Sequence, residues 1–413
     1  MSVTPGKKIL LVCQHFWPES FRINDIADFL VEKKCDVDVL CGIPNYPTGS
    51  FYPVYSLIKN RKQNHNGITI RRVFEVPRGN NSSLRIFINY LSFPIASLFH
   101  VPYMLTKQYD KILLYQLSPV MMTIAGIIIG KIKKIETTMY VLDLWPENLF
   151  SVMNIKNKIL RRLVTHVSHW HYRKVDKIIV LSQQMKQRIV EITHISDVKI
   201  IVLPQACEKI YETPVADAKL SKRFADGFNV VFTGNISPAQ SFDTIIDAAI
   251  LLKKEGVGDI NWIIVGDGMS KKQVEQRVKN EGLSSIFHFE GSKPIEDMPK
   301  YTAIADVLVG CLVKSELLEA TVPAKVMSYI ASGKPIVLAM DGEVQTLINT
   351  TIRCGYAGPA GNQESLCVNI KKVHQSSARQ RLALGNLAKN HHFKHFERNL
   401  ILNKMHNFIF DVR

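Results

Sequence analysis

The sequence lacks the cysteine patterns of a disulfide framework or a zinc site. Its seven cysteines are odd in number and scattered, with no Cys-x-x-Cys pair and no histidine at a metal-ligand spacing. They are Cys13, Cys35, Cys41, Cys207, Cys311, Cys354 and Cys367. We therefore expect a reducing compartment and no structural zinc.

The chain also lacks a secretory signal. Its first residues reach a strand-like run at once, without a long apolar stretch and a small-residue cleavage site, so we expect a cytoplasmic protein. One nearly apolar run, residues 86–105, is interrupted by Asn89, Pro94, His100 and Pro102, which hydrocarbon tolerates poorly. Three interpretations of this run stay open: a buried or interdomain helix pair, an interfacial membrane surface, or a membrane span.

Acidic residues are few relative to basic ones. The chain has 52 Lys and Arg against 36 Asp and Glu, and residues 1–215 hold 28 and 16 of these, so that +12 of the net +16 lies in the first half. Such an excess suits nucleic acid, an anionic membrane face or a phosphorylated substrate. No helix-turn-helix spacing, aromatic RNA-binding signature or basic tail is present, so we expect no nucleic-acid partner. Basic clusters at residues 131–134 and 156–174 favour a membrane surface.

Short β-branched runs alternate with helical patterns throughout the chain, which predicts parallel sheets with crossover helices. In the first half the expected strands are residues 9–13, 37–41, 68–73, 112–116, 138–142, 178–181 and 200–203, with helices at 25–33 and 161–175. In the second half they are 229–233, 261–265, 286–289, 307–312 and 335–338, with helices at 242–254, 271–281, 298–305 and 324–331. The polar stretch 208–224 is expected to be a linker.

The predicted fold class is therefore α/β, with two doubly wound, Rossmann-like domains. We expect an N-terminal domain at 1–215, a C-terminal domain at 216–395 and a C-terminal helix at 396–413 that returns to the first domain. Two such domains that face each other form a cleft lined by the carboxyl ends of both sheets, where open α/β sheets bind ligands.

Three loops at the expected carboxyl edge of the second sheet suit an anionic ligand. They are Gly234-Asn235, Gly266-Asp267-Gly268 and Thr321-Val322-Pro323-Ala324-Lys325. Glycines admit close backbone approach, and a helix that starts with proline presents free amides to which Lys325 can add charge. Each glycine loop could equally be an ordinary turn, and Lys325 a surface residue of an amphipathic helix.

Three loops of the first domain combine carboxylates or amides with prolines and aromatic rings. They are residues 14–19, which include Glu19, residues 42–49, which include Asn45 and Tyr46, and residues 143–147. Such loops suit a site that holds a polyhydroxylated ring by stacking and hydrogen bonds.

Five segments in this order resemble family 4 glycosyltransferases, the retaining nucleotide-sugar enzymes of the GT-B fold. They are NYPTGSFYP, DLWPEN, TGNISPAQSFDTIIDAA, WIIVGDG and TVPAKVMSYIASGKPIV. The chain most resembles the WbuB-like group of O-antigen and capsule enzymes, several of which transfer N-acetyl-L-fucosamine. The resemblance implies a UDP-sugar donor in the C-terminal domain, a lipid-linked saccharide acceptor in the N-terminal domain, no cofactor and no essential metal. It also implies work at the inner face of the bacterial cytoplasmic membrane.

The resemblance also implies roles for single residues. The donor site would comprise Gly234, Asn235, Gln240, Gly266, Asp267, Gly268, Thr321, Pro323, Lys325 and Ser328. The acceptor site would comprise Asn45, Tyr46, Trp145 and Glu147, with Asp143 and Glu19 as catalytic candidates that orient the acceptor or assist as a base. Asp143 could instead only cap its own turn.

The chain departs from the family at two acidic positions. Ser328 and Ala320 stand where related enzymes carry the two glutamates of a Glu-x7-Glu pattern. Either Glu316 or Glu319 substitutes, or Ser328 makes a weaker ribose contact, or activity is reduced. Two other classes therefore stay open: a nucleotide-sugar epimerase of the same fold, and a non-catalytic partner in a polysaccharide assembly complex.

Overall fold

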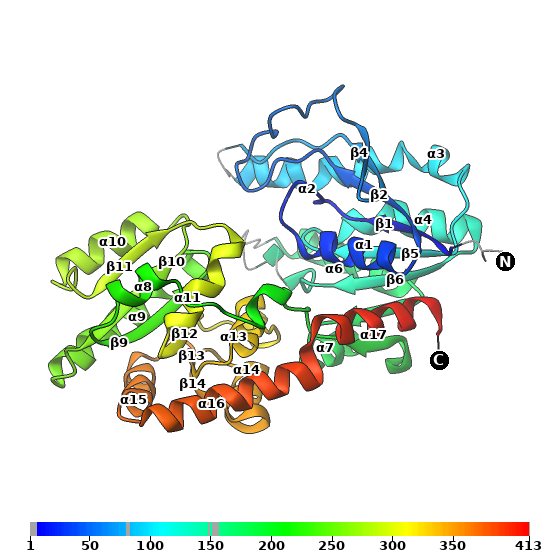
Figure 1. Cartoon of the computed structure of the whole chain (residues 1–413). Coiled ribbons are helices and arrows are strands. Elements are labelled where there is room, and N and C mark those ends of the chain that lie inside the picture. Colours follow the sequence, from blue (N-terminus) through cyan, green and yellow to red (C-terminus); the bar gives the residue numbers. More distant parts are fainter. Residues whose placement is uncertain (1–5, 80–82, 148, 151–156, 413) are drawn as a thin grey trace. The chain divides into compact units, whose positions relative to one another are not determined.

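The computed structural model describes residues 6–79, 83–147, 149–150 and 157–412, and the chain forms two compact units (Figure 1). Unit 1 comprises Met1–Leu203 together with Leu402–Arg413, and unit 2 comprises Pro204–Ile401. The basic cluster expected at 156–174 begins outside the described residues, at Lys156.

Unit 1 is built on an eight-stranded sheet in the order β3-β4-β2-β1-β5-β6-β7-β8. All neighbouring strands are parallel except the antiparallel pair of β3 and β4. The strands are β1 Lys8–Val12, β2 Asp36–Gly42, β3 Lys62–His65, β4 Ile68–Val73, β5 Lys111–Gln116, β6 Glu136–Val141, β7 Lys177–Val180 and β8 Ile200–Val202.

The central strands of unit 1 are almost completely buried because helices cover the sheet, which explains their continuous apolar sequences. The helices are α1 Arg22–Glu32, α2 Ser83–Leu98, α3 Val101–Leu105, α4 Ile124–Lys133, α6 Lys158–Lys174 and α7 Gln183–Thr193. Side-chain caps fix two of the helix starts: Asn157 accepts from the first amides of α6, and Ser182 accepts from Met185 N of α7.

Unit 2 is built on a six-stranded parallel sheet in the order β11-β10-β9-β12-β13-β14. The strands are β9 Phe228–Thr233, β10 Ile260–Val265, β11 Phe287–Gly291, β12 Val307–Cys311, β13 Ile336–Ala339 and β14 Gly355–Gly358. The helices are α8 Ala218–Arg223, α9 Phe242–Lys254, α10 Lys271–Asn280, α11 Met298–Ile304, α12 Glu316–Glu319, α13 Ala324–Ser332, α14 Glu343–Thr346, α15 Gln363–His374 and α16 Ala378–His391.

Alternate residues of the unit 2 strands enter two separate apolar clusters, one on each face of the sheet. Val230 and Phe232 pack with α9 and α15, whereas Val231, between them, packs with α13. Burial on both faces therefore fixes where each strand ends, and with it the position of the loops at the carboxyl edge.

The C-terminal helix α17, Arg398–Phe410, ends against the strands of unit 1. Asp411, just after it, forms ion pairs with Lys111 of β5 and with Lys177 of β7, and Lys177 Nζ also donates to Phe408 O at 2.8 Å. These contacts attach the end of the chain to the amino-terminal edge of the first sheet.

Each strand and helix expected from periodicity is present within a few residues, and the fold is the predicted pair of Rossmann-like sheets. The pattern missed β3, which is short and polar, and β14, which contains two glycines. The stretch 208–224 is not an extended linker, because Tyr211 and Phe224 are buried in the apolar core of unit 2. The apolar run 86–105 forms α2 and α3, and no described helix is both long and apolar enough to span a bilayer.

Candidate functional site

Glycines let the loops after β9 and β10 come into contact at the carboxyl edge of the unit 2 sheet. Gly234 and Gly266 have φ values of 130° and 150°, and a Cβ on Gly266 would lie 1.9 Å from Gly234 O. Gly234 N donates to Val265 O at 2.9 Å. A side chain on Gly266 would therefore separate the two loops, whose glycines are partly exposed at this edge of the sheet.

The next residues of both loops hold each other in place. Ile236 N donates to Asp267 O at 2.8 Å, and a Cβ on Gly268 would lie 2.3 Å from Asn235 Oδ1. Asp267 Oδ1 accepts from Gly268 N at 2.7 Å, and this backbone hydrogen bond lowers the pKa of the Asp267 carboxyl. The structure thus gives Asp267 a local role in shaping its own turn.

Lys325 lies beside Gly234, and among the described residues no carboxylate pairs with it. Its Nζ donates to Gln240 Oε1 at 2.5 Å and lies 3.8 Å from the centroid of the Phe232 ring. A Cβ on Gly234 would be 3.2 Å from Nζ, so the amine borders the glycine loops. Burial lowers the pKa of Lys325 to about 7. A partly buried ammonium with only neutral partners suits an anionic ligand.

The helix that carries Lys325 adds backbone donors. Helix α13 starts at Ala324, directly after Pro323, so the first amides of the helix, including that of Lys325, have no acceptor within the helix. Thr321 Oγ1 donates to Leu318 O at 2.9 Å and closes the turn before the helix. Gly234, Asn235, Gln240, Lys325 and the start of α13 are together called the glycine-loop site below.

Ser328 and Ala320 occupy the two positions of this part of the chain at which related enzymes have glutamates. Ser328 is buried in α13, and its Oγ makes a long, 3.4 Å hydrogen bond to Ala324 O. Ala320 is buried as well, whereas Glu319 is half-buried in α12. The side chain of Glu316 lies outside the described residues.

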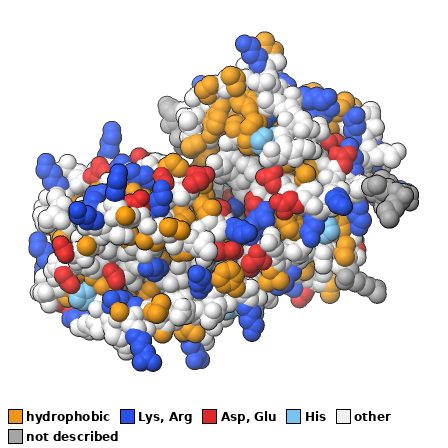
Figure 2. Space-filling view, in the orientation of Figure 1, with side chains coloured by type: hydrophobic (Ala, Val, Ile, Leu, Met, Phe, Trp, Pro, Cys, Tyr) orange, Lys and Arg blue, Asp and Glu red, His pale blue; other side chains and the backbone are white. Residues whose placement is uncertain are grey.

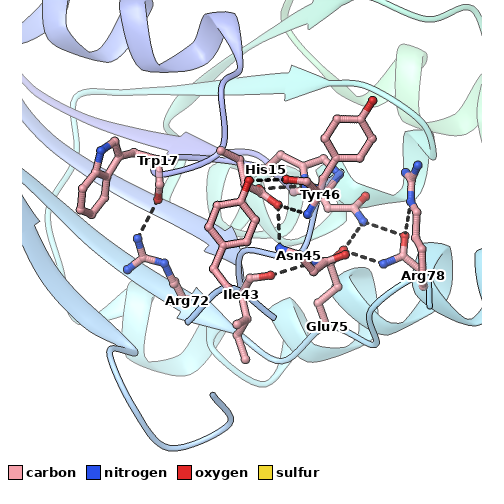
Figure 3. A network of polar contacts seen from close by, with 12 residues as sticks. His15, Trp17, Ile43, Asn45, Tyr46, Arg72, Glu75 and Arg78 are labelled. Atoms are coloured by element: carbon pink, nitrogen blue, oxygen red, sulfur yellow. Dashed lines mark hydrogen bonds and ion pairs between the residues drawn. The ribbon is translucent and has the colours of Figure 1, made fainter. Parts of the chain in front are cut away.

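At the carboxyl edge of the unit 1 sheet, Glu19 joins the loops that follow β1 and β2 through contacts with His15, Asn45 and Tyr46, which are labelled in Figure 3. One carboxylate oxygen accepts from the amides of Asn45 and Tyr46 at 2.8 and 2.7 Å, and the other lies 3.0 Å from His15 Nδ1. The His15 ring stacks on Phe21 at 4.7 Å. The buried Glu19 therefore fixes the conformation of the Asn45-Tyr46 loop, with its oxygens directed into the protein.

A second buried carboxyl, Glu75, lies beside this pair and was not expected from the sequence. Glu75 Oε1 accepts from Gln14 Nε2 and Asn89 Nδ2, each at 2.7 Å (Figure 3). Its Oε2 has no hydrogen-bond partner in the described part of the chain, and burial raises the pKa of Glu75. Glu75 links the loop after β4 to α2 and to the loop after β1.

Asp143 and Ser118 meet where β5 and β6 end. Ser118 Oγ donates to Asp143 Oδ2 at 3.0 Å and accepts from Trp145 Nε1 at 2.9 Å. The Trp145 ring is only 1% exposed, and its backbone amide donates to Tyr172 OH at 3.0 Å. Trp145 thus packs inside unit 1 and supports the Asp143 loop. Glu147 forms an ion pair with Arg188 of α7 at 3.2 Å.

The structure brings the predicted residues together in two groups, one in each unit. Gly234, Asn235, Gln240, Gly266 and Lys325 form the first, and Glu19, Asn45 and Tyr46 lie in the second. Sequence reasoning missed Tyr329, whose hydroxyl accepts from Thr233 N at 2.9 Å and anchors the end of β9, and it missed Glu75. Glu75 follows a predicted strand, so the rule that located the other loops could have found it. No group of three metal-ligating side chains occurs in the described ranges.

Comparisons with known proteins agree with this architecture. Residues 227–376, within unit 2, match the family described as glycosyl transferases group 1. HepE from Anabaena, solved in complex with UDP, superposes with a TM-score of 0.72 at 17% identity, covering 98% of this chain and all of that one. The fold is thus the pair of Rossmann-like domains seen in HepE and in the glycosyltransferase WaaG, and residues 227–376 are similar to group 1 glycosyl transferases.

Two curated relatives are also similar in sequence. A 2-deoxystreptamine glucosyltransferase from Streptomyces kanamyceticus is 27% identical over 50% of this chain, and the alignment spans only 58% of that enzyme. WcaI from Escherichia coli, described as a putative colanic acid biosynthesis glycosyl transferase, is 22% identical over 81% of this chain and 83% of its own length.

Proposed function

We propose that the protein is a retaining glycosyltransferase of polysaccharide biosynthesis. The donor would be a UDP-sugar, with N-acetyl-L-fucosamine or a related N-acetylamino sugar as the group transferred. The acceptor would be a saccharide linked to polyprenyl diphosphate, used for O-antigen or capsule. The description of WcaI as a colanic acid enzyme and the UDP bound to HepE support this proposal.

The observation that carries the proposal is the position of Lys325. The amine is partly buried, has a pKa near 7 and lies over an aromatic ring. In the described part of the chain no carboxylate neutralises its positive charge. The diphosphate of a nucleotide would supply the negative charge. The free amides at the start of α13 and the open backbone at Gly234 would bind the remaining phosphate oxygens.

The proposed mechanism uses these groups to stabilise the leaving group. When the bond between the sugar and the diphosphate breaks, negative charge grows on the phosphate oxygen, and a preorganised ammonium with helix-terminal amides stabilises it. The acceptor hydroxyl would attack from the same face of the sugar and transfer its proton to the donor phosphate. Asp143, held by Ser118, would orient that hydroxyl or assist its deprotonation.

Titration with nucleotides and a panel of UDP-sugars tests the proposal. We expect UDP to bind with 1:1 stoichiometry, and one UDP-sugar of the panel to be slowly hydrolysed in the absence of acceptor, with release of UDP. A protein that binds none of the nucleotides, or one that converts a UDP-sugar into its epimer without release of UDP, would contradict it.

The low pKa of Lys325 predicts a specific pH dependence of UDP binding. Only the protonated amine attracts the diphosphate, and the bound diphosphate raises the pKa of the amine, so that above pH 7 binding requires uptake of a proton. We expect UDP affinity to fall by up to about tenfold for each pH unit above 7. Calorimetry in buffers of different ionisation enthalpy should detect proton uptake at pH 8, and Lys325→Arg should remove both effects because arginine stays charged.

We also propose that unit 1 associates peripherally with an anionic membrane. Helix α6 exposes Arg161, Arg162, Arg173 and Lys174, together with apolar side chains such as Ile159. At about 1 kcal/mol for each basic residue near an anionic surface, four of them contribute about 4 kcal/mol, which suffices for reversible attachment.

Sedimentation with liposomes measures this association. We expect binding to anionic but not to neutral vesicles, loss of binding at high salt because the charges are screened, and loss when the four basic residues of α6 are replaced together by serine. A matched variant with serine at Lys253, Lys254, Lys272 and Lys279 of unit 2 removes the same charge and should still bind. Equal loss in both variants would show that only net charge matters.

A further inference from the structure

Arg78 lies at the carboxyl edge of the unit 1 sheet, in the loop between β4 and α2, and has unused donors. Its Nε donates to Asn89 Oδ1 at 3.3 Å, and within the described part of the chain no carboxylate pairs with it. The guanidinium has five N–H donors, so most of them are left for a ligand or for water.

Two tyrosines hold this guanidinium in place. The Arg78 Cζ atom lies 5.6 Å from the ring centroid of Tyr46 and 5.6 Å from that of Tyr90 (Figure 3 shows Arg78 at the side of the network that contains Tyr46). Tyr46 belongs to the loop fixed by Glu19, and Tyr90 belongs to α2. Ring contacts on two sides limit the orientations of the guanidinium without neutralising its charge, as in a preorganised anion site.

Helix α2, which begins close to Arg78 in the chain, presents an apolar outer face. Its exposed side chains recur at helical spacing and form what we call the α2 stripe: Leu84, Phe87, Ile88, Ile95 and Phe99, the last in the turn after the helix. Leu84 is 68% and Phe99 is 80% exposed. The helix contains no acidic residue and a single basic one, Arg85, in its first turn.

Arg85 brings a second positive charge to the start of the stripe. A Cβ on Gly79 would lie 3.6 Å from Arg85 Nε, so Arg85 reaches back to the residue that follows Arg78 in the chain. Figure 2 shows apolar side chains gathered on the upper part of unit 1. In the loop after β2, Val54, Leu57 and Ile58 are also exposed. A row of exposed apolar side chains such as the α2 stripe is typical of an interaction surface.

We propose that Arg78, Arg85 and the α2 stripe bind an isoprenoid diphosphate, the carrier portion of a lipid-linked acceptor. The diphosphate would lie on the two arginines, and the first isoprene units would cover the stripe, which extends for about 24 Å along the helix at 1.5 Å per residue. The charge of the two arginines and the apolar side chains that follow them match a ligand with an anionic head and an apolar chain. The inference rests on the proposed function, because a lipid-linked acceptor is part of that proposal.

Contacts within unit 1 connect this surface to Asp143. The Tyr90 ring lies 6.2 Å from the ring of Trp145, edge to face, and Trp145 Nε1 donates to the Ser118 hydroxyl that is bonded to Asp143. An acceptor diphosphate on Arg78 would therefore place the sugar attached to it close to the Asp143 carboxylate. Arg78 would act as a binding residue that positions the acceptor, and it would take no part in the bond-making step.

The test uses farnesyl diphosphate, inorganic pyrophosphate and farnesol as probes, with saturating UDP present to fill the glycine-loop site. We expect farnesyl diphosphate to bind at least tenfold more tightly than pyrophosphate, and farnesol not to bind measurably. Arg78→Gln should weaken both anionic probes by about tenfold to a hundredfold. Replacing Ile88 and Ile95 together by serine should lower only the affinity for farnesyl diphosphate. Arg379→Gln, an exposed arginine of unit 2, is the matched control and should change neither.

If Arg78→Gln does not fold, Arg85→Gln, at an exposed site, replaces it and should weaken both anionic probes in the same direction. Equal binding of farnesyl diphosphate by the wild type, Arg78→Gln and Arg85→Gln would overturn the inference. The donor proposal is tested separately, by UDP titration of Lys325→Met. Normal UDP binding with no effect of Arg78→Gln on the farnesyl probe rejects this inference alone, whereas arginine-dependent binding of the farnesyl probe without any UDP binding rejects the proposed function alone.

Discussion

Lys325→Met is expected to weaken UDP binding by roughly 1.5–3 kcal/mol, the range for a hydrogen bond to a charged group, which corresponds to a loss of about tenfold to more than a hundredfold. The amine borders Gly234 without a carboxylate partner in the described part of the chain, whereas Lys271, at the other glycine loop, is paired with Asp267 at 3.4 Å, and Gln240 contributes only a neutral amide. Methionine keeps the length and the contact with the Phe232 ring and removes the charge, so isothermal titration with UDP isolates the charge contribution.

The same substitution is expected to stabilise the protein without ligand. Because the pKa of Lys325 is lowered to about 7 in the folded state, the unfolded chain binds more protons between pH 7 and 10.5. The native state is therefore penalised most below pH 7, and the penalty declines as the pH rises toward 10.5. Removal of the amine relieves it, and each kcal/mol relieved raises the Tm of a domain of this size by roughly 2–4 °C.

Lys272→Met provides the control for both measurements. Lys272 is an exposed lysine of α10, so its replacement should change neither UDP affinity nor the Tm by a measurable amount. Thermal unfolding at pH 7 and at pH 9 should show the larger difference between Lys325→Met and the wild type at pH 7. A Lys325→Met variant that binds UDP normally would contradict the assignment of Lys325, and one that is destabilised would show that the buried amine makes favourable contacts in the free protein.

The sequence predicted the loops of the donor site but not the contacts between their residues. The loops at the carboxyl ends of β9 and β10 could be predicted, because strand periodicity locates the end of each strand and a glycine there indicates a loop that can bind a ligand through its backbone. That Gly266 faces Gly234, and that Lys325 lies on the Phe232 ring, depends on side-chain packing across the sheet. Periodicity assigns residues to a face of an element but does not identify their neighbours.

In unit 1, too, the sequence predicted the strands and loops but not the contacts of their side chains. Trp145 looked like a ring suited to stacking on a sugar, yet its burial and its bond to Ser118 make it a support for the Asp143 loop. Glu75 and Arg78 come from the loop between β4 and α2, and their roles depend on how α2 folds back against that loop, with Asn89 on Glu75 and Tyr90 on Arg78. Local sequence carries no signal for contacts of this kind, because each partner looks like an ordinary polar residue.

Asp143→Asn is expected to lower the rate of glycosyl transfer by about a hundredfold to ten-thousandfold, the usual contribution of a positioned acid or base. The amide keeps the size of the carboxyl and can still accept from the Ser118 hydroxyl, which donates to Asp143 at 3.0 Å, so the loop should retain its conformation. Only the negative charge is lost, and with it the ability to orient and deprotonate an acceptor hydroxyl.

Two readouts separate this role from a structural one. UDP affinity should be unchanged in Asp143→Asn, because the glycine-loop site is built entirely from unit 2, and slow hydrolysis of the donor without acceptor should continue, because water needs no orientation by Asp143. Asp197→Asn, which removes an exposed carboxylate of unit 1 that pairs with Lys186, should transfer sugar at the wild-type rate. If Asp143→Asn lowers transfer and hydrolysis equally, Asp143 acts on the donor. If it lowers neither transfer nor hydrolysis, Asp143 only caps its turn, and the donor phosphate alone is the base. Lys325 and the amides of α13, which stabilise the leaving diphosphate, are then the groups that determine the rate.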